Sequence, residues 1–127
     1  MKTVKQKNGC DAVIASIASL CGLSYNVVKE QADKISPTIP LLPHMIDKVH
    51  ALLNRFVECK KILRTDEELS KWVMSNSGNK ALLIVVNEAR LHCVAFDHGE
   101  LHDPSREEGA WAETLNGRLF QVLMVQK

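Results

Sequence analysis

The chain has 127 residues, with 16 lysines and arginines against 15 aspartates and glutamates, which gives a formal net charge of +1. Because binding to nucleic acids or to anionic membranes draws on a strongly basic surface, this balance argues against both as partners. Hydrophobic residues make up 46% of the sequence and charged residues 24%, as in ordinary globular proteins, and the length suits a single domain over residues 1–127.

The first half of the chain has the pattern of helices. An almost unbroken apolar run from Asp11 to Leu20 predicts a helix that is buried on all sides and ends near Gly22. Ser24 is a typical N-cap and predicts a second helix from Tyr25 to about Lys34. After a segment with three prolines, apolar residues at intervals of three and four predict a third helix from Met45 to Phe56.

The second half changes to the pattern of strands. The short mixed segment from Val57 to Leu63 is typical of an edge strand, and Thr65 to Glu68 resembles a capping box that opens a fourth helix through Trp72 and Met74. Three apolar runs then predict strands at Ala81–Val86, Leu91–Phe96 and Leu119–Val125, with a tight turn at Asp97–Glu100. Helices followed by strands indicate an α+β domain with an antiparallel sheet.

Compartment and cofactors follow from the N-terminus and the cysteines. No stretch reaches the roughly 20 apolar residues that a membrane-spanning helix needs, and the basic N-terminal residues precede no usual signal cleavage site, which favours a cytoplasmic protein. The four cysteines form no Cys-x-x-Cys pair, and with the five histidines they match no familiar zinc spacing. We therefore expect reduced thiols and neither metal nor cofactor, with Cys21 and Cys93 as packing residues and Cys59 without a chemical role.

Cys10 stands where a catalytic thiol would be expected, directly before the buried helix. At a helix N-terminus the unpaired backbone N–H groups and the positive end of the dipole favour thiolate over thiol. The same donors would stabilise an oxyanion. Taken alone, a cysteine in this position is more often a small packing residue.

His92 and Asp103 are the polar residues of the strand half that bear on this chemistry. Alternation places His92 on one face of its strand with Val94 and Phe96, while Cys93 points the other way. An imidazole can take the proton of a thiol, and a carboxylate on a neighbouring strand would hold the ring in the required tautomer. Singly, His92 also fits a half-buried structural histidine and Asp103 the start of a turn; only the combination favours catalysis.

These motifs together resemble the papain-like cysteine peptidases. The likeness rests on Gln6-Lys-Asn-Gly-Cys10 before a buried helix, on His92-Cys-Val-Ala-Phe96 and on Leu101-His-Asp103-Pro. It is greatest to the bacteriocin-processing peptidase domains of ABC transporters and their small stand-alone relatives from bacteria and phages, to which Cys21-Gly-Leu-Ser-Tyr-Asn-Val-Val28 is also similar. The resemblance covers nearly the whole chain. It implies N-terminal helices, including a buried helix that starts at the cysteine, packed on a C-terminal antiparallel sheet.

The resemblance also implies a cysteine hydrolase, a peptidase in the first place, that acts on a peptide or protein substrate. It assigns Cys10 as nucleophile, His92 as general base and acid, Asp103 as the acid that orients the imidazole, and Gln6 as an oxyanion-hole donor.

Two positions depart from the family pattern. Gln6 lies closer to Cys10 than the family's glutamine usually does, and Val4 occupies the usual spacing, so that Asn8 is an alternative donor. Asp11 stands where the family commonly has glycine; an acid there either opposes thiolate formation or stabilises the first helical turn.

These departures leave two other functions open. In the first, the chain has the fold but binds a peptide or partner protein without cleaving it, since a fold does not determine function. Alternatively, the same thiol and imidazole carry out another acyl transfer, such as deamidation of a protein glutamine or transglutaminase-like chemistry.

Overall fold

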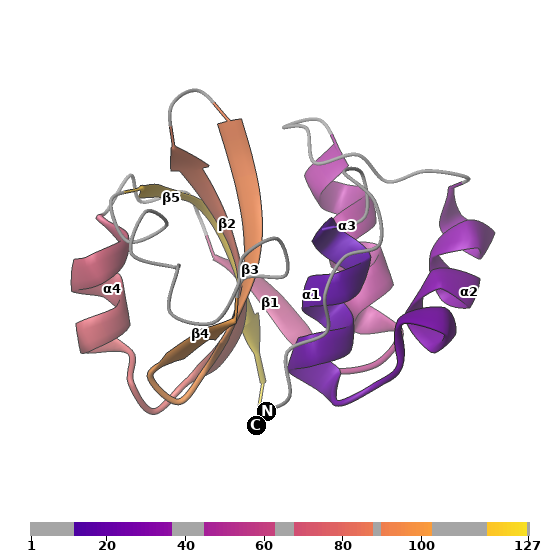
Figure 1. Cartoon of the computed structure of the whole chain (residues 1–127), viewed down its shortest axis with the longest axis horizontal. Coiled ribbons are helices and arrows are strands. Elements are labelled where there is room, and N and C mark those ends of the chain that lie inside the picture. The colour runs from indigo at the N-terminus through magenta and orange to yellow at the C-terminus, as the bar shows by residue number, and fades with distance from the viewer. Residues whose placement is uncertain (1–11, 37–44, 63–67, 88–89, 103–116, 127) are drawn as a thin grey trace.

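The computed structural model describes residues 12–36, 45–62, 68–87, 90–102 and 117–126. These ranges contain four helices, α1 (Ala12–Cys21), α2 (Tyr25–Ile35), α3 (Ile46–Asn54) and α4 (Leu69–Ser75), and five strands, β1 (Cys59–Ile62), β2 (Lys80–Asn87), β3 (Arg90–Asp97), β4 (Glu100–His102) and β5 (Arg118–Val125). The strands form one antiparallel sheet in the order β1-β5-β2-β3-β4 (Figure 1). The expected α+β class is confirmed.

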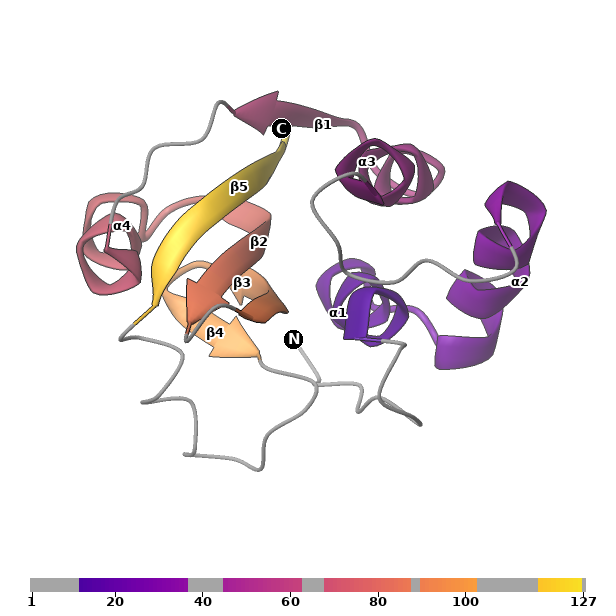
Figure 2. The same cartoon turned by 90° about the horizontal axis from the view of Figure 1, so that it is seen from above.

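The sheet lies between two unequal helical layers. α1 and α3 cover one face, with α2 outside them, and α4 covers the other face (Figure 2). Each face has its own apolar cluster. The α1 cluster, on the α1 face, is built with α1, α2 and α3, and the α4 cluster, on the α4 face, is built with α4. Among the described residues the sheet separates the two clusters, so the direction of each strand side chain decides which helices it contacts.

α1 is buried nearly all round, as the apolar run predicts. Every residue from Val13 to Leu20 is buried. The helix ends at Cys21, where Gly22 has a φ of +67° and the N–H of Leu23 donates to the Ala18 carbonyl. Glycine adopts this left-handed conformation without the steric cost of a side chain, which is why the helix stops there.

α2 and α3 also match their patterns. Ser24 caps α2 by accepting a hydrogen bond from the N–H of Val27 at 3.3 Å. Both helices are amphipathic and turn their apolar residues toward α1 and the sheet. The buried residues are Val28 and Ala32 in α2, and Ile46, Val49, Leu52 and Leu53 in α3.

α4 begins later than the capping-box pattern predicts. Its N-cap is Glu68, whose side chain makes no capping hydrogen bond; Thr65 lies outside the described residues. Glu68 instead forms an antiparallel bridge with Arg118, and the N–H of Leu69 donates to the Gly117 carbonyl at 3.1 Å. Because this pairing holds the chain extended beside the start of β5, the helix cannot begin before Leu69.

β2, β3 and β5 match the predicted apolar runs. β2, β3 and β4 pair with their neighbours in sequence, whereas both partners of β5 come from distant parts of the chain. β1 is an edge strand, as expected, and pairs with β5, which lies between β1 and β2. β3 and β4 form a hairpin around His98 and Gly99, whose φ angles are 48° and 93°. Two positive φ angles are the geometry of the tight hairpin turn that suits twisted strands.

Within the described ranges, no helix is both long enough and apolar enough to cross a bilayer. The longest of these helices, α2, has 11 residues.

Candidate active site

One of the residues predicted for the active site lies in the part of the chain that the structure describes. This residue is His92, near the start of β3. Cys10, Gln6 and Asp103 lie outside the described residues, as do the neighbouring positions Val4, Asn8 and Asp11. The structure therefore tests the surroundings of the histidine and of α1, the helix that follows the cysteine.

His92 lies on the α4 face of the sheet and is half-buried. It is paired across the ladder with Val85, which belongs to the α4 cluster. Val94 and Phe96 belong to the same cluster, while Cys93 and Ala95 pack in the α1 cluster. The alternation predicted for this strand is thus confirmed, and the imidazole starts on the face opposite α1.

α1 is fastened directly to β3 next to this histidine. The hydroxyl of Ser16 donates a hydrogen bond of 2.8 Å to the carbonyl oxygen of Cys93. Ser16 is fully buried and Cys93 is 2% exposed. Cys93 and Ala95, two of the β3 residues on the face toward α1, are small, which lets the helix approach this part of the strand closely.

The two elements also run in the same direction. Both α1 and β3 run from top to bottom in Figure 1, so both begin toward the same end of the molecule. Ala12, the first residue of α1, precedes Ser16 by about 6 Å along the helix axis, and His92 immediately precedes Cys93. His92 and the first residue of α1 therefore lie on the same side of the hydrogen bond from Ser16 to Cys93.

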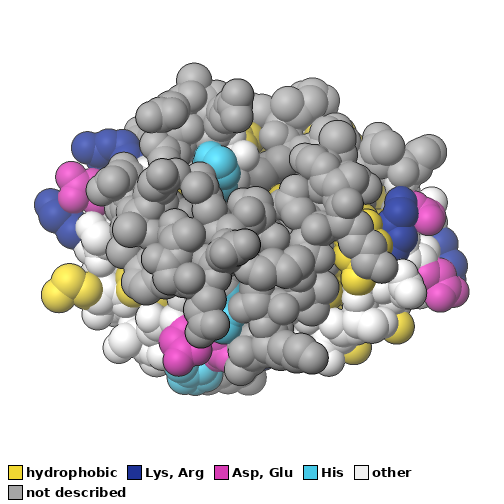
Figure 3. Space-filling view, viewed as in Figure 1, with side chains coloured by type: hydrophobic (Ala, Val, Ile, Leu, Met, Phe, Trp, Pro, Cys, Tyr) yellow, Lys and Arg dark blue, Asp and Glu magenta, His cyan; other side chains and the backbone are white. Residues whose placement is uncertain are grey.

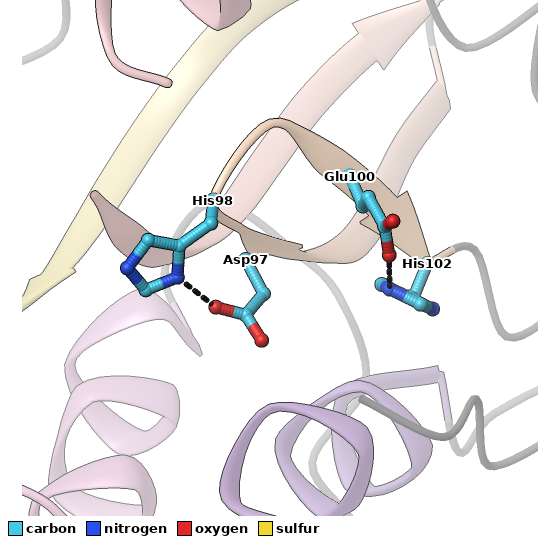
Figure 4. A network of polar contacts seen from close by, with 4 residues as sticks. All are labelled: Asp97, His98, Glu100 and His102. Carbon is cyan, nitrogen blue, oxygen red and sulfur yellow. Dashed lines mark hydrogen bonds and ion pairs between the residues drawn. The ribbon is translucent and has the colours of Figure 1, made fainter. Parts of the chain in front are cut away.

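A second polar group lies at the opposite end of β3, around the β3–β4 hairpin (Figure 4). Nδ1 of His98 donates to the Asp97 carboxylate, and Nε2 of His102 lies 3.5 Å from Oε2 of Glu100. Burial alone would raise the pKa of Asp97, but the hydrogen bond from His98 and the positive charge of Lys80 outweigh it and lower this pKa. The carboxylate is thus held in its charged form.

His102 was not predicted from the sequence to take part in catalysis. It is paired with Ala95 and so shares the α1 face of the sheet, with 12% of its side chain exposed. The sequence signal that could have placed His102 is the two-residue turn at His98 and Gly99. A turn of this length determines the register of β3 and β4, and thereby the face of the sheet on which His102 lies. His102 lies opposite the later part of β3, farther than His92 from the end at which α1 begins.

Two of the described thiols are not activated. Cys21, Cys59 and Cys93 form no disulfide; burial raises the pKa of Cys21 and raises that of Cys59 to about 11, the latter with a further contribution from the neighbouring Cys21. Cys59 is also bound to Asn54, whose Oδ1 accepts from both its N–H and its thiol. Cys93 is buried and Cys21 half-buried against the α1 cluster, in agreement with a packing role.

Neither metal nor a strong charge marks the described surface. Among the described residues, no group of three or more His, Cys, Asp or Glu side chains is placed to hold a metal ion. On the face shown in Figure 3, the described Lys and Arg side chains lie at the two lateral margins, next to Asp and Glu. Mixed charges of this kind produce only a weak field.

Comparison of the chain with models of protein families, with curated proteins and with solved structures finds no match in any of the three. The function is therefore inferred from the residues and from the geometry of α1 and β3.

Proposed function

We propose that this protein is a papain-like cysteine hydrolase, in the first place a peptidase, with Cys10 as nucleophile, His92 as general base and acid, Asp103 as orienting acid and Gln6 as oxyanion donor. The observation that supports this most is the hydrogen bond of Ser16 to Cys93. It joins the helix that follows the cysteine to the strand that carries the histidine, at a point next to His92. The two elements also begin toward the same end of the molecule (Figure 1).

The proposed reaction has two acyl-transfer steps. His92 takes the proton of the Cys10 thiol, and the thiolate attacks the carbonyl carbon of the scissile amide to form a C–S bond. The C–N bond then breaks, and the imidazolium gives its proton to the leaving amine. In the second step water attacks the thioester while His92 takes its proton, the C–S bond breaks, and the acid product and the free thiol are released.

The other two residues support these steps. Asp103, the residue that follows β4 in the chain, would accept the ring N–H of His92 and stabilise the imidazolium. Gln6 would donate to the oxyanion of each tetrahedral intermediate, alongside backbone N–H groups at the helix start. The raised pKa values of Cys21 and Cys59 make both of them poor nucleophiles, which leaves Cys10 as the better candidate.

One observation favours a second candidate, a papain-like module that binds a peptide or partner protein without cleaving it. His92 starts on the face of the sheet opposite α1. Catalysis therefore requires its imidazole to reach past the beginning of β3 to meet the thiol. If the two groups do not meet, the thiol is not activated and only binding remains.

The experiment that separates the two candidates is the pH dependence of iodoacetamide alkylation at Cys10, followed by mass spectrometry on the native protein. An activated pair would be alkylated rapidly well below the free-thiol pKa of about 8.5. His92→Ala should slow this reaction, while the matched control His102→Ala should leave it unchanged. An ordinary profile in the native protein would remove the hydrolase proposal and support the binding module.

The same experiment tests the choice of histidine. If His102→Ala slows alkylation and His92→Ala does not, the base is the histidine on the α1 face and the proposed triad is wrong. Once activation is established, analysis of the products from a peptide library distinguishes cleavage from deamidation of glutamine, with Cys10→Ala as the inactive reference.

A further inference from the structure

Ser16 is a polar residue in a helix that is otherwise almost entirely apolar. It is fully buried in the middle of α1. A buried hydroxyl destabilises a fold unless it is hydrogen-bonded. In a helix the usual partner is a carbonyl one turn earlier, and Ser19 follows this pattern by donating to the Ala15 carbonyl at 2.9 Å. Ser16 instead donates to β3, at Cys93, a residue 77 positions away in the sequence.

This hydrogen bond constrains α1 in a way that apolar packing does not. Apolar contacts are non-directional, so the packing of α1 against Cys93 and Ala95 defines the position of the helix less sharply than a directional bond does. A hydrogen bond weakens steeply as its distance and angle change. The bond from Ser16 therefore adds a restraint on both the axial position and the rotation of α1 on β3.

The hydrogen bond lies close to both groups of the proposed reaction, the start of α1 and His92. The Cys93 carbonyl belongs to the residue next to His92, and Ser16 lies one helical turn after the first residue of α1. We propose that Ser16 is a positioning residue, which sets the helix start relative to His92 and so promotes thiolate formation at Cys10. This inference rests on the hydrolase function proposed above. A misplacement of about 1 Å between reacting groups is enough to cost about a hundredfold in rate.

Ser16→Ala tests the inference, with Ser19→Ala as its matched control. Both variants remove one buried hydroxyl from the same helix; the first breaks the hydrogen bond to β3 and the second the hydrogen bond to Ala15 within α1. Alanine is smaller than serine and favourable in helices, so both variants are expected to fold. Circular dichroism and urea unfolding check this before the kinetics, and Ser16→Thr, which keeps the hydroxyl, provides a second variant.

The measured quantity is the rate of Cys10 alkylation between pH 5 and 9. We expect Ser16→Ala to shift the profile toward that of a free thiol and to slow alkylation at pH 6.5 by roughly three- to tenfold, as for a pKa increase of about half to one unit. Ser19→Ala should retain the profile of the natural protein, and Ser16→Thr should restore most of it. A purely structural role would change the urea midpoint without moving the pH profile.

The failure of this inference differs from the failure of the proposed function. Suppose that the pH profile of Cys10 alkylation in the natural protein depends on His92, but that Ser16→Ala has the same profile as the natural protein. Ser16 is then a structural residue and the inference is wrong. If Ser19→Ala shifts the profile as much as Ser16→Ala, the contact with β3 has no special role. If the natural protein itself shows a free-thiol profile that His92→Ala does not change, the hydrolase proposal falls and the positioning role falls with it.

Discussion

The two faces of β3 are packed by different means. Toward α1 the strand presents the small residues Cys93 and Ala95, and a buried hydrogen bond from Ser16 holds the helix. Toward α4 it presents Val94 and Phe96, and the contact is made by large apolar groups. On the α1 face the helix is therefore held by close approach and a directional bond, whereas on the α4 face large side chains fill the space between strand and helix. His92 lies on the second face but is proposed to act with the helix of the first.

An aromatic pair joins α4 to β3 on the α4 face. The rings of Trp72 and Phe96 meet edge to face, with centroids 5.1 Å apart and planes at 70°. Such pairs add about 0.5–1.5 kcal/mol to the stability that comes from their burial alone. Phe96 is fully buried, so its removal leaves a cavity beneath α4 that the short helix cannot easily fill.

The largest expected effect is therefore from Phe96→Ala. We expect it to lower the free energy of unfolding by about 3–5 kcal/mol, because the transfer energy and the aromatic contact are lost and a cavity remains. Urea unfolding measures this change. Met74→Ala is the control on α4, since Met74 is 83% exposed and its truncation should have almost no effect. Equal losses of stability in the two variants would show that the buried Phe96 side chain does not stabilise the α4 face.

Ala95→Leu probes the opposite face and should have the next largest effect. The added side chain has to fit where α1 lies close to β3, and such overpacking costs about 1–3 kcal/mol. Val94→Ile adds a single methylene group toward α4 and is expected to cost less. Urea midpoints of the two variants give the comparison. A well-tolerated leucine at this position would mean that small residues are not required under α1.

The third prediction concerns Cys59, which lies in the α1 cluster. Burial, assisted by the neighbouring Cys21, raises the pKa of Cys59 from 9.0 to about 11. A raised pKa means that the folded state holds the thiol proton more tightly than the unfolded state. The resulting stability is complete below about pH 9 and is lost as the pH rises through 11.

We therefore expect the free energy of unfolding to fall between pH 8 and pH 10.5, and to fall less in Cys59→Ala. Urea unfolding at the two pH values measures the difference, and comparison with the variant removes the contribution of lysine and tyrosine titration. Met74→Ala should follow the natural protein at both pH values. An identical pH dependence in Cys59→Ala would show that this thiol titrates alike in the folded and unfolded chains.

The local pattern of the sequence predicted most of the elements. The apolar run of α1, the cap at Ser24 and the alternation of β3 depend on neighbours within a few residues, and each is confirmed. The start of α4 is different. Its capping box was a local signal, but the pairing of Glu68 with Arg118, which is distant in sequence, overrode it.

The candidate site was predictable in part. Residue types and their order pointed to Cys10, His92 and Asp103, and alternation correctly assigned the face of His92 relative to its neighbours on the strand. Which helix covers that face was not predictable, because alternation relates the residues of one strand to each other and not to a helix elsewhere in the chain. The importance of Ser16 was hidden for the same reason: its partner lies on β3.

By itself, the sequence determined the helices, the strands and the apolar faces, because periodicity and capping are properties of short segments. Only the tertiary structure decided that β5 lies between β1 and β2, that α1 packs on Cys93 and Ala95, and that His102 shares this face while His92 faces α4. These relations join residues far apart in the chain. They depend on how the whole sheet and its two layers of helices bury their apolar surface together, which no local pattern records.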